Sequence, residues 1–387
     1  MAYSNTLSRN RRLQVLSCLL LLAGGAHASY HDFGIPASRA TVDVRVFNVA
    51  NMTLTGGTHA FITPALPGHE STTFPMYSFL VEHRQSNKRL QFDLGIRSDP
   101  ETVPSLSAFF NAGIIHLEPY EDITTLLQDG GIALSSIDAV IWSHAHFDHV
   151  GDMSKFLNTT GLIIGAATDI STYPENLNAT LVASDLAGHH ITRLDFTNAT
   201  LNFSGLKAID YFGDGSFYLL DTPGHLPGHT TALARVTPTS FVVLGGDTFH
   251  HAGQARPRPQ FQKTYPCPAH LLEESKSAVS TDYFWSHGTR IGVFDIPSRA
   301  QQFLALSDLP DSFYADPVKS QVSLEKIASF DADPDFLVVT AHDISLRSSI
   351  PYFPAYTNGW KASRLKEELV WNFLDQSNPA FVFSPTN

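Results

Sequence analysis

The sequence predicts an α/β protein built from two mixed β-sheets with helices on their outer faces. Short apolar runs recur along the chain and alternate with segments of helical spacing, which is the pattern expected of layered α/β folds. The predicted strands cover residues 42–49, 77–81, 89–94, 139–142, 162–165, 217–220, 241–244 and 336–339. The predicted helices cover residues 121–128, 318–330 and 363–374.

The strand at 139–142 is followed directly by a dense cluster of metal-ligand side chains. Within six positions the chain places His144, His146, Asp148 and His149. Histidine nitrogens and carboxylate oxygens bind zinc and similar divalent metals. Single histidines on a strand face are common, but four residues of metal-ligand type in six positions at a strand end indicate a metal site.

Three further ligand candidates follow at strand ends or turns. Residues 221–230 read Asp-Thr-Pro-Gly-His-Leu-Pro-Gly-His-Thr, and His229 is the candidate there. Asp247 follows the strand at 241–244, and His342 follows the strand at 336–339. The ordered set, which begins with His-x-His-x-Asp-His, resembles the metallo-β-lactamase superfamily of metallohydrolases.

This resemblance implies an αββα sandwich with two metals at one edge, between the sheets. Zinc is the expected metal, with iron or manganese as alternatives. By the family pattern one metal is bound by His144, His146 and His229, the other by Asp148, His149 and His342, and Asp247 bridges them.

The doubled Pro-Gly-His turn narrows the resemblance to the N-acyl homoserine lactonase branch and its fungal relatives. The expected function is hydrolysis of a lactone by attack of a metal-bound hydroxide on a small-molecule substrate with an activated carbonyl. Secondary metabolism or detoxification would be the setting. A thioesterase, a lactamase or a non-catalytic metal-binding protein are the alternatives.

Two residues are candidates for catalytic roles beside the ligands. Asp148 is placed to pass a proton to the leaving group. His250 stands where bacterial lactonases of this branch carry a tyrosine near the substrate carbonyl, so it either polarises a carbonyl or protonates a leaving group, or is a loop histidine without a role. Asp93, at another strand end, is expected to organise a loop and not to bind metal.

The N-terminus has the layout of a secretory signal peptide. Arg9, Arg11 and Arg12 precede an apolar run at 13–23, and small residues suggest cleavage after Ala28. An uncleaved signal anchor is the alternative. Glycosylation sequons agree with secretion and stand at Asn51, Asn158, Asn178, Asn198 and Asn202.

Residues 29–387 are predicted to form one hydrolase domain, because ligand candidates spread over nearly 200 residues must converge. An enlarged segment at 248–335 is expected to form the substrate wall. Arg256 and Arg258 within it either meet a substrate carboxylate or are solvated loop charges. Cys267 would be the one cysteine left after signal cleavage, and no catalytic role is expected for it.

The chain is acidic, with a formal net charge of −12 at pH 7. Loss of the predicted signal would remove arginines and no acids, so the mature protein would be more acidic still. Such a surface does not attract nucleic acid or anionic membranes. The composition therefore disfavours the nuclease and phosphodiesterase branches of the superfamily.

Overall fold

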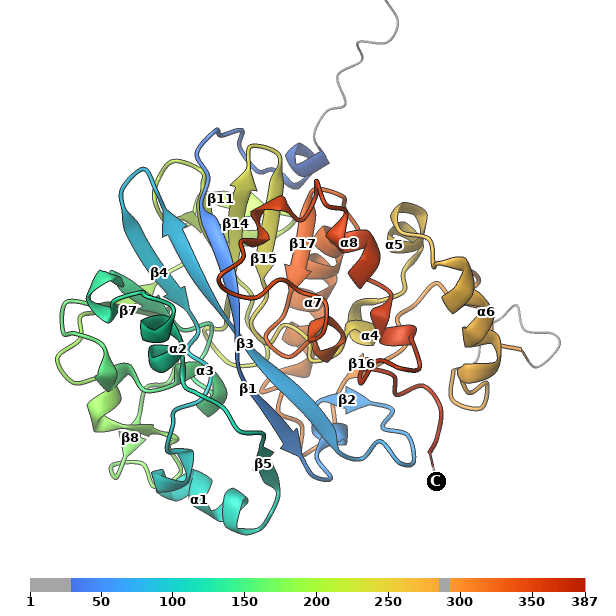
Figure 1. Cartoon of the computed structure of the whole chain (residues 1–387), viewed down its shortest axis with the longest axis horizontal. Helices are drawn as coiled ribbons and strands as arrows, with labels where there is room; N and C mark the ends of the chain where they lie inside the picture. Colours follow the sequence, from blue (N-terminus) through green and yellow to red (C-terminus); the bar gives the residue numbers. More distant parts are fainter. Residues whose placement is uncertain (1–28, 285–292, 387) are drawn as a thin grey trace, which may run out of the picture.

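A computed structural model describes residues 29–284 and 293–386 of the chain. The predicted signal segment lies outside these residues. Two large sheets face each other, as Figure 1 shows. The first has seven strands in the order β10-β7-β6-β4-β3-β1-β5, and the second has six in the order β11-β12-β13-β14-β15-β17. None of the described helices is both long and apolar enough to span a bilayer.

The strands of the first sheet are β1 (Asp43–Leu54), β3 (Thr72–His83), β4 (Lys88–Phe92), β5 (Ile115–Leu117), β6 (Ala139–Ile141), β7 (Gly161–Gly165) and β10 (Ile191–Leu194). Those of the second are β11 (Leu201–Phe203), β12 (Leu206–Asp210), β13 (Phe217–Asp221), β14 (Thr230–Thr237), β15 (Ser240–Leu244) and β17 (Phe336–Val339). Two small pairs add β2 (Ile62–Thr63) with β16 (Ala305–Leu306), and β8 (Thr172–Tyr173) with β9 (Leu181–Val182).

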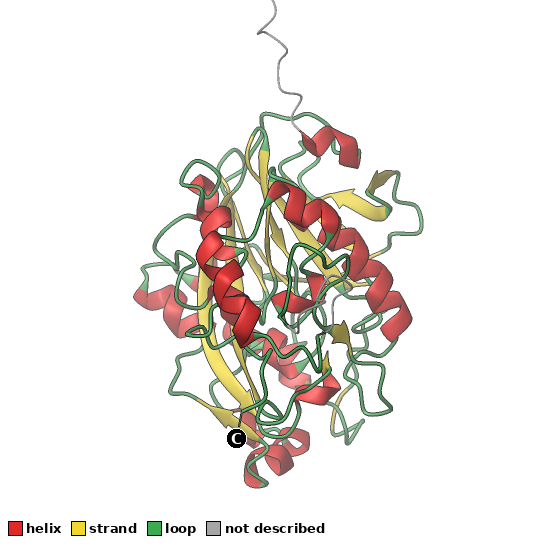
Figure 2. Cartoon of the chain, turned by 90° about the vertical axis from the view of Figure 1, so that its right-hand side faces the viewer, coloured by secondary structure: helices red, strands yellow, loops and turns green. Residues whose placement is uncertain are grey.

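The helices lie outside the sheets (Figure 2). They are α1 (Pro104–Asn111), α2 (Ile123–Asp129), α3 (Phe147–Val150), α4 (Ala252–Ala255), α5 (Pro259–Thr264), α6 (Ala269–Ala278), α7 (Pro317–Asp331) and α8 (Leu365–Leu369). The predicted helix at 363–374 is divided, because α8 ends at Leu369 and a separate 3-10 turn covers Asn372–Leu374.

Alternation of side chains along the strands produces the layers. In β3, Phe79 and Val81 join the core between the two sheets, whereas Met76 and Leu80 join the core on the outer face of the first sheet. That outer core also contains Leu127 of α2. On the far side, the apolar side chains of α7 pack on the outer face of the second sheet. The expected αββα sandwich is therefore confirmed.

Parallel pairing determines where the site forms. β4 pairs in parallel with β6, and β15 pairs in parallel with β17. The C-terminal ends of parallel neighbours meet at the same edge of their sheet. The residues that follow these four strands, which include Asp93, His144, Asp247 and His342, are thereby gathered at one edge of the sandwich.

Candidate metal centre

Asp247 lies at the centre of the cluster, and each of its oxygens faces a different set of histidines. Oδ2 lies 3.2 Å from Nε2 of His225 and 3.6 Å from Nε2 of His144. Oδ1 lies 3.0 Å from Nε2 of His149 and 3.2 Å from Nε2 of His342. This arrangement suits a carboxylate that spans two metal ions.

Two groups of ligand atoms surround this carboxylate. His144, His146 and His225 form the first with Asp247, and His146 Nδ1 lies 2.9 Å from Nε2 of both other histidines. The second group is composed of Asp148, His149 and His342. Within each group the ligand atoms lie within 4.8 Å of one another.

The donor set fits divalent metals. Asp247 Oδ1 is buried and accepts no hydrogen bond, although two histidine nitrogens face it. Burial, and then neighbouring imidazoles, lower the pKa of His144 and His146 well below the usual range. Neutral imidazoles with converging lone pairs are the form that binds metals.

The structure corrects the sequence assignment of the third ligand. His225, four residues before His229, occupies the place in the first group. His229 is buried beside it, but its Nε2 accepts a hydrogen bond of 2.9 Å from the amide of Asp247. Its Nδ1 lies 3.0 Å from the carbonyl oxygen of Thr222. With both ring nitrogens engaged by the protein, His229 has no atom free for a metal.

Hydrogen bonds on the far side of the ligand rings set their orientation. Asp93 Oδ2 lies 2.9 Å from His149 Nδ1, and its carboxylate also accepts from the amide and the hydroxyl of Ser143. His342 Nδ1 lies 2.8 Å from the carbonyl oxygen of Pro75. Such outer partners fix the ring and the tautomer of a metal-binding histidine. Asp93 thus has the organising position expected of it.

His250 is part of the same cluster. Its Nε2 lies 3.1 Å from Asp247 Oδ2, its ring stacks on His342, and it also forms a third potential ligand group with these two residues. Burial lowers the pKa of His250 to about 3 although the Asp247 carboxylate favours the charged form. His250 is therefore in contact with the cluster, as either of its two expected catalytic roles requires.

A cavity of about 410 Å³ opens onto these residues. His146, Asp148, Asp247, His250 and His342 lie in its lining. The remaining wall is mainly apolar, and no lysine or arginine lines it among the described residues. Its apolar side chains are Met52, Leu54, Ala60, Phe61, Phe74, Leu106, Phe109, Ile114, Ile115, Phe147 and Phe313.

This wall comes mostly from a part of the chain that sequence reasoning did not single out. Residues 52–61 and 106–115 supply most of it, whereas the described residues of segment 248–335 contribute only His250, Asp311 and Phe313. Arg256 and Arg258 take no part: Arg256 is buried in a two-pronged pair with Asp331, and Arg258 pairs with Glu325. Arg256 is thus not a solvated loop charge.

Comparison with known proteins agrees with the ligand pattern. The profile of the family described as the metallo-beta-lactamase superfamily matches residues 104–342. The chain belongs to this superfamily. It is 37% identical over 362 residues to the metallo-hydrolase mfmC of Annulohypoxylon moriforme, covering 90% of each chain. It is also 32% identical to the gamma-lactamase FDB1 of Fusarium pseudograminearum, covering 89% of this chain and 84% of that one.

Solved structures show the same superfamily fold. An N-acyl homoserine lactone hydrolase, with the product N-hexanoyl-L-homoserine at its catalytic metal centre, matches with a TM-score of 0.52 at 18% identity. The match covers 82% of this chain and 99% of that one. The recognition of a metallo-β-lactamase superfamily hydrolase from the sequence is therefore confirmed.

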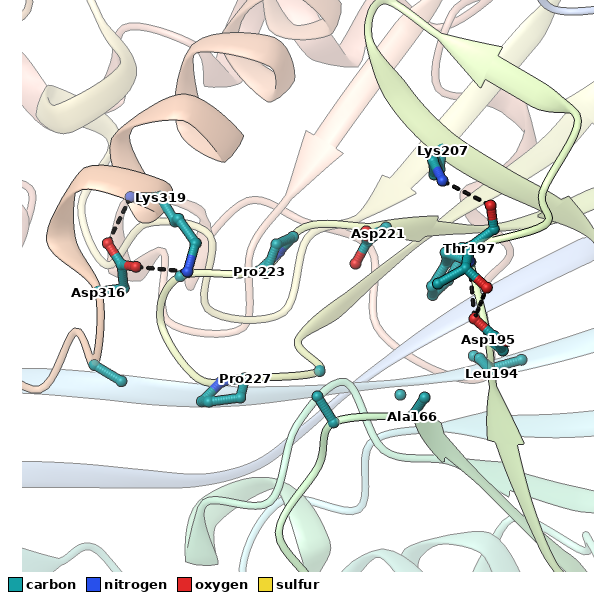
Figure 3. A pocket seen from close by; sticks show the side chains of 16 residues that line it. Ala166, Leu194, Asp195, Thr197, Lys207, Asp221, Pro223, Pro227, Asp316 and Lys319 are labelled. Carbon is teal, nitrogen blue, oxygen red and sulfur yellow. Dashed lines mark hydrogen bonds and ion pairs between the residues drawn. The ribbon is translucent and has the colours of Figure 1, made fainter.

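A second cavity, of about 620 Å³, is lined in part by the loop at residues 223–228 (Figure 3). Its walls include Pro223 and Pro227 of that loop, and four of its five charged side chains have a partner, since Asp195 accepts from the amide and the hydroxyl of Thr197. Lys319 pairs with Asp316, and Lys207 donates to the carbonyl oxygen of Thr197. No member of the ligand groups lines this cavity in the described structure, so it is separate from the metal centre.

Proposed function

We propose that the protein is a hydrolase that uses two metal ions to open the ring of a neutral, apolar lactone. The observation that carries this proposal is the position of Asp247, which lies between two ligand groups and lines the apolar cavity. A substrate that enters this cavity is brought directly to the ligand cluster.

The residues of the centre would bind the metals, and one of them, Asp148, would also transfer a proton. His144, His146 and His225 would hold one metal, Asp148, His149 and His342 the other, and Asp247 would bridge them. Bound zinc, or iron or manganese, would polarise the ester carbonyl and make water nucleophilic at neutral pH. Asp148 lines the cavity and lies 3.4 Å from His342 Nε2. Its carboxylate is therefore placed to carry a proton to the leaving alkoxide.

The cavity wall supports a neutral substrate with an apolar body. Five phenylalanines line it, namely Phe61, Phe74, Phe109, Phe147 and Phe313. Burial of an apolar ring or chain against such a wall contributes roughly 25 cal/mol for each Å² removed from water. An anionic substrate would find no lysine or arginine among the described lining residues.

A γ-lactam is the second candidate, because the relative FDB1 is named as a gamma-lactamase and matches most of this chain. Hydrolysis of a lactone and hydrolysis of a lactam both require a nucleophile and a polarised carbonyl. They differ in the leaving group, since an amine must be protonated to depart. A matched pair of substrates, identical except for the ring oxygen or nitrogen, separates the two activities.

We further propose that the protein is secreted and glycosylated. Asn158, Asn178, Asn198 and Asn202 are exposed, as attachment of a glycan requires. Asn51 differs, because it is partly buried in β1 and its side chain donates a hydrogen bond to Glu118. Treatment of the protein from a eukaryotic secretory host with an N-glycosidase should lower its mass, and variants of the exposed sequons should reduce that change.

The test of the proposed activity combines metal analysis with a substrate panel. Purified protein should contain about two metal ions per chain, and a chelator should abolish the opening of apolar lactones until zinc is returned. If protein with two bound metals cleaves no lactone, lactam or thioester, the proposed activity is wrong.

A further inference from the structure

Tyr314 reaches the metal centre from a distant part of the sequence and contacts His250. Its hydroxyl lies 2.7 Å from Nδ1 of His250, and the two rings are nearly perpendicular with centroids 5.4 Å apart. Tyr314 is buried, with only 2% of its surface exposed. This contact therefore forms away from solvent, where water does not compete for it.

The segment around Tyr314 is fixed to the site on both sides. The amide of Phe313 donates to the carbonyl oxygen of Ala60 in the cavity wall. The amides of Ala315 and Asp316 donate to the carbonyl oxygens of His225 and Gly224, in the loop that places His225 in the first ligand group. Tyr314 is consequently held in register with the centre and has little freedom to turn its hydroxyl elsewhere.

The hydroxyl proton of Tyr314 identifies the tautomer of His250. Most buried phenols donate their proton to an acceptor, because an unmade hydrogen bond away from water is costly. In the part of the chain that the structure describes, the His250 Nδ1 atom is the acceptor found within reach. The amide oxygen of the neighbouring Gln254 is already occupied, since it accepts from the backbone amides of His250 and His251.

If Nδ1 accepts this hydrogen bond, a neutral His250 carries its own proton on Nε2. That N–H is directed at Asp247 Oδ2, 3.1 Å away, and the ring also lines the cavity. A protonated Nε2 has no lone pair to offer a metal. The grouping of His250 with Asp247 and His342 is therefore a matter of proximity and not of ligation.

We propose that Tyr314 is a positioning residue that holds His250 with its proton on Nε2, so that His250 is not a metal ligand and its one N–H, which faces Asp247 Oδ2 at the cavity wall, is shared between this oxygen and the substrate. This inference rests on the proposed function for the identity of the acceptor, a substrate carbonyl or leaving oxygen. Donors fixed in advance at such a point stabilise the charge that develops during ester hydrolysis.

The first experiment observes the tautomer directly. Zinc-loaded protein labelled with ¹⁵N-histidine is compared with Tyr314→Phe by two-bond ¹H–¹⁵N correlation, with His250→Ala used to assign the signal. The wild-type His250 should show the Nε2–H pattern, and Tyr314→Phe should show a mixture of both tautomers. Tyr218→Phe is the matched control, because Tyr218 is buried in β13, outside the ligand cluster, and lies beside Arg235 and not beside a histidine of the site.

The second experiment separates a donor from a ligand. His250→Ala should keep both metals and lose roughly a hundredfold in kcat, the size expected when one oxyanion donor is removed. Tyr314→Phe should lose about tenfold in kcat with KM little changed, since it acts through His250. The double variant should be no slower than His250→Ala alone.

Loss of one metal from His250→Ala, or an Nδ1–H tautomer in the wild-type protein, would overturn the inference. So would additive losses in the double variant. Failure of the proposed function gives a different result: no lactone is opened, while the tautomer and the metal content of His250→Ala remain as expected.

Discussion

The amide of Asp247 donates a hydrogen bond to Nε2 of His229 at 2.9 Å, so the second histidine of the Pro-Gly-His repeat holds the backbone of Asp247, whereas the first faces its carboxylate. The two histidines share one loop and one sequence context. They nevertheless have different chemical roles, because His225 directs Nε2 at Asp247 Oδ2, 3.2 Å away, whereas His229 directs its Nε2 at the Asp247 backbone.

Substitution of these two histidines should therefore give different results. His225→Ala removes a ligand of the first metal, and we expect about one metal per chain and a loss of activity of at least a hundredfold. His229→Ala removes a buried hydrogen bond instead, at a cost of about 1 to 3 kcal/mol in the free energy of unfolding. Elemental analysis, together with urea unfolding of both variants, distinguishes these outcomes.

The decisive comparison is metal content under identical loading. If His229→Ala loses a full metal equivalent while His225→Ala keeps both, the ligand assignment given by the structure is wrong. His189→Ala is a suitable control, because His189 lies outside the ligand groups and its Nδ1 contacts a backbone carbonyl oxygen.

Asp93 should affect the metals without binding them. Its carboxylate holds His149 Nδ1 and accepts two hydrogen bonds from Ser143. We expect Asp93→Ala to weaken binding of the more weakly held metal by about 10- to 100-fold, the range observed when outer partners of metal ligands are removed. Competition with a chromophoric chelator measures this affinity. An unchanged affinity would show that the ring of His149 needs no such support.

The ligand motif was predictable because it is local. An apolar strand followed by His144, His146, Asp148 and His149 requires only short-range geometry to bring the side chains together. The αββα sandwich followed from strand runs and from the resemblance carried by those ligands. The choice between His225 and His229 was not predictable from the residues, because both follow a Pro-Gly pair. It depends on how the loop turns between the sheets.

Contacts between distant segments were also beyond the sequence. Tyr314 is separated from His250 by 64 positions, and no periodic pattern connects them. The cavity wall at residues 52–61 and 106–115 was missed because, in the sequence, apolar residues that line a cavity look the same as apolar residues of the core. The short helices α4 and α5 escaped prediction for a simpler reason, since four to six residues are too few to show a helical period.

Phe313 should determine affinity for the apolar part of the substrate. Its ring stacks on Phe61 with a centroid separation of 4.7 Å and lines the cavity, while 44% of its surface remains exposed. Phe313→Ala should raise KM for an apolar lactone by about tenfold, equivalent to about 1.4 kcal/mol, and leave kcat within about twofold. Because the side chain is partly exposed, stability should change little.

A small lactone without an apolar substituent provides the internal comparison for Phe313. Its KM should be nearly the same in the variant and the wild-type protein. Leu177→Ala, which removes an exposed apolar side chain outside the cavity, should leave both substrates unaffected. An equal rise in KM for both lactones would contradict the assigned role of this wall.

The buried pair of Arg256 and Asp331 should be important for stability and not for catalysis. Two hydrogen bonds of 2.8 Å join the guanidinium to the carboxylate, and neither side chain lines the cavity. Asp331→Ala leaves a buried charge without its partner, which costs about 3 to 5 kcal/mol. Urea unfolding should show this loss, while KM for lactones stays unchanged in the folded fraction. A large rise in KM would return Arg256 to the substrate site.

Asp122 should give the protein part of its resistance to acid. Burial alone would raise the pKa of this carboxyl, but hydrogen bonds from Lys155 and from the Thr125 amide at the start of α2 lower it to about 2. A carboxyl with a lowered pKa stabilises the folded state above its unfolded pKa, near 3.8, and this contribution is lost as the pH falls towards 2. Discounted for solvent at the half-exposed Lys155, it is worth about 1 to 2 kcal/mol. Asp122→Ala should therefore be less stable than the wild type by this amount at pH 6, and the difference should shrink by pH 2.5.

Asp129→Ala, at the other end of α2, should show no such loss. A wild-type advantage over Asp122→Ala that is equal at both pH values would mean that packing, and not the charge of Asp122, produces it.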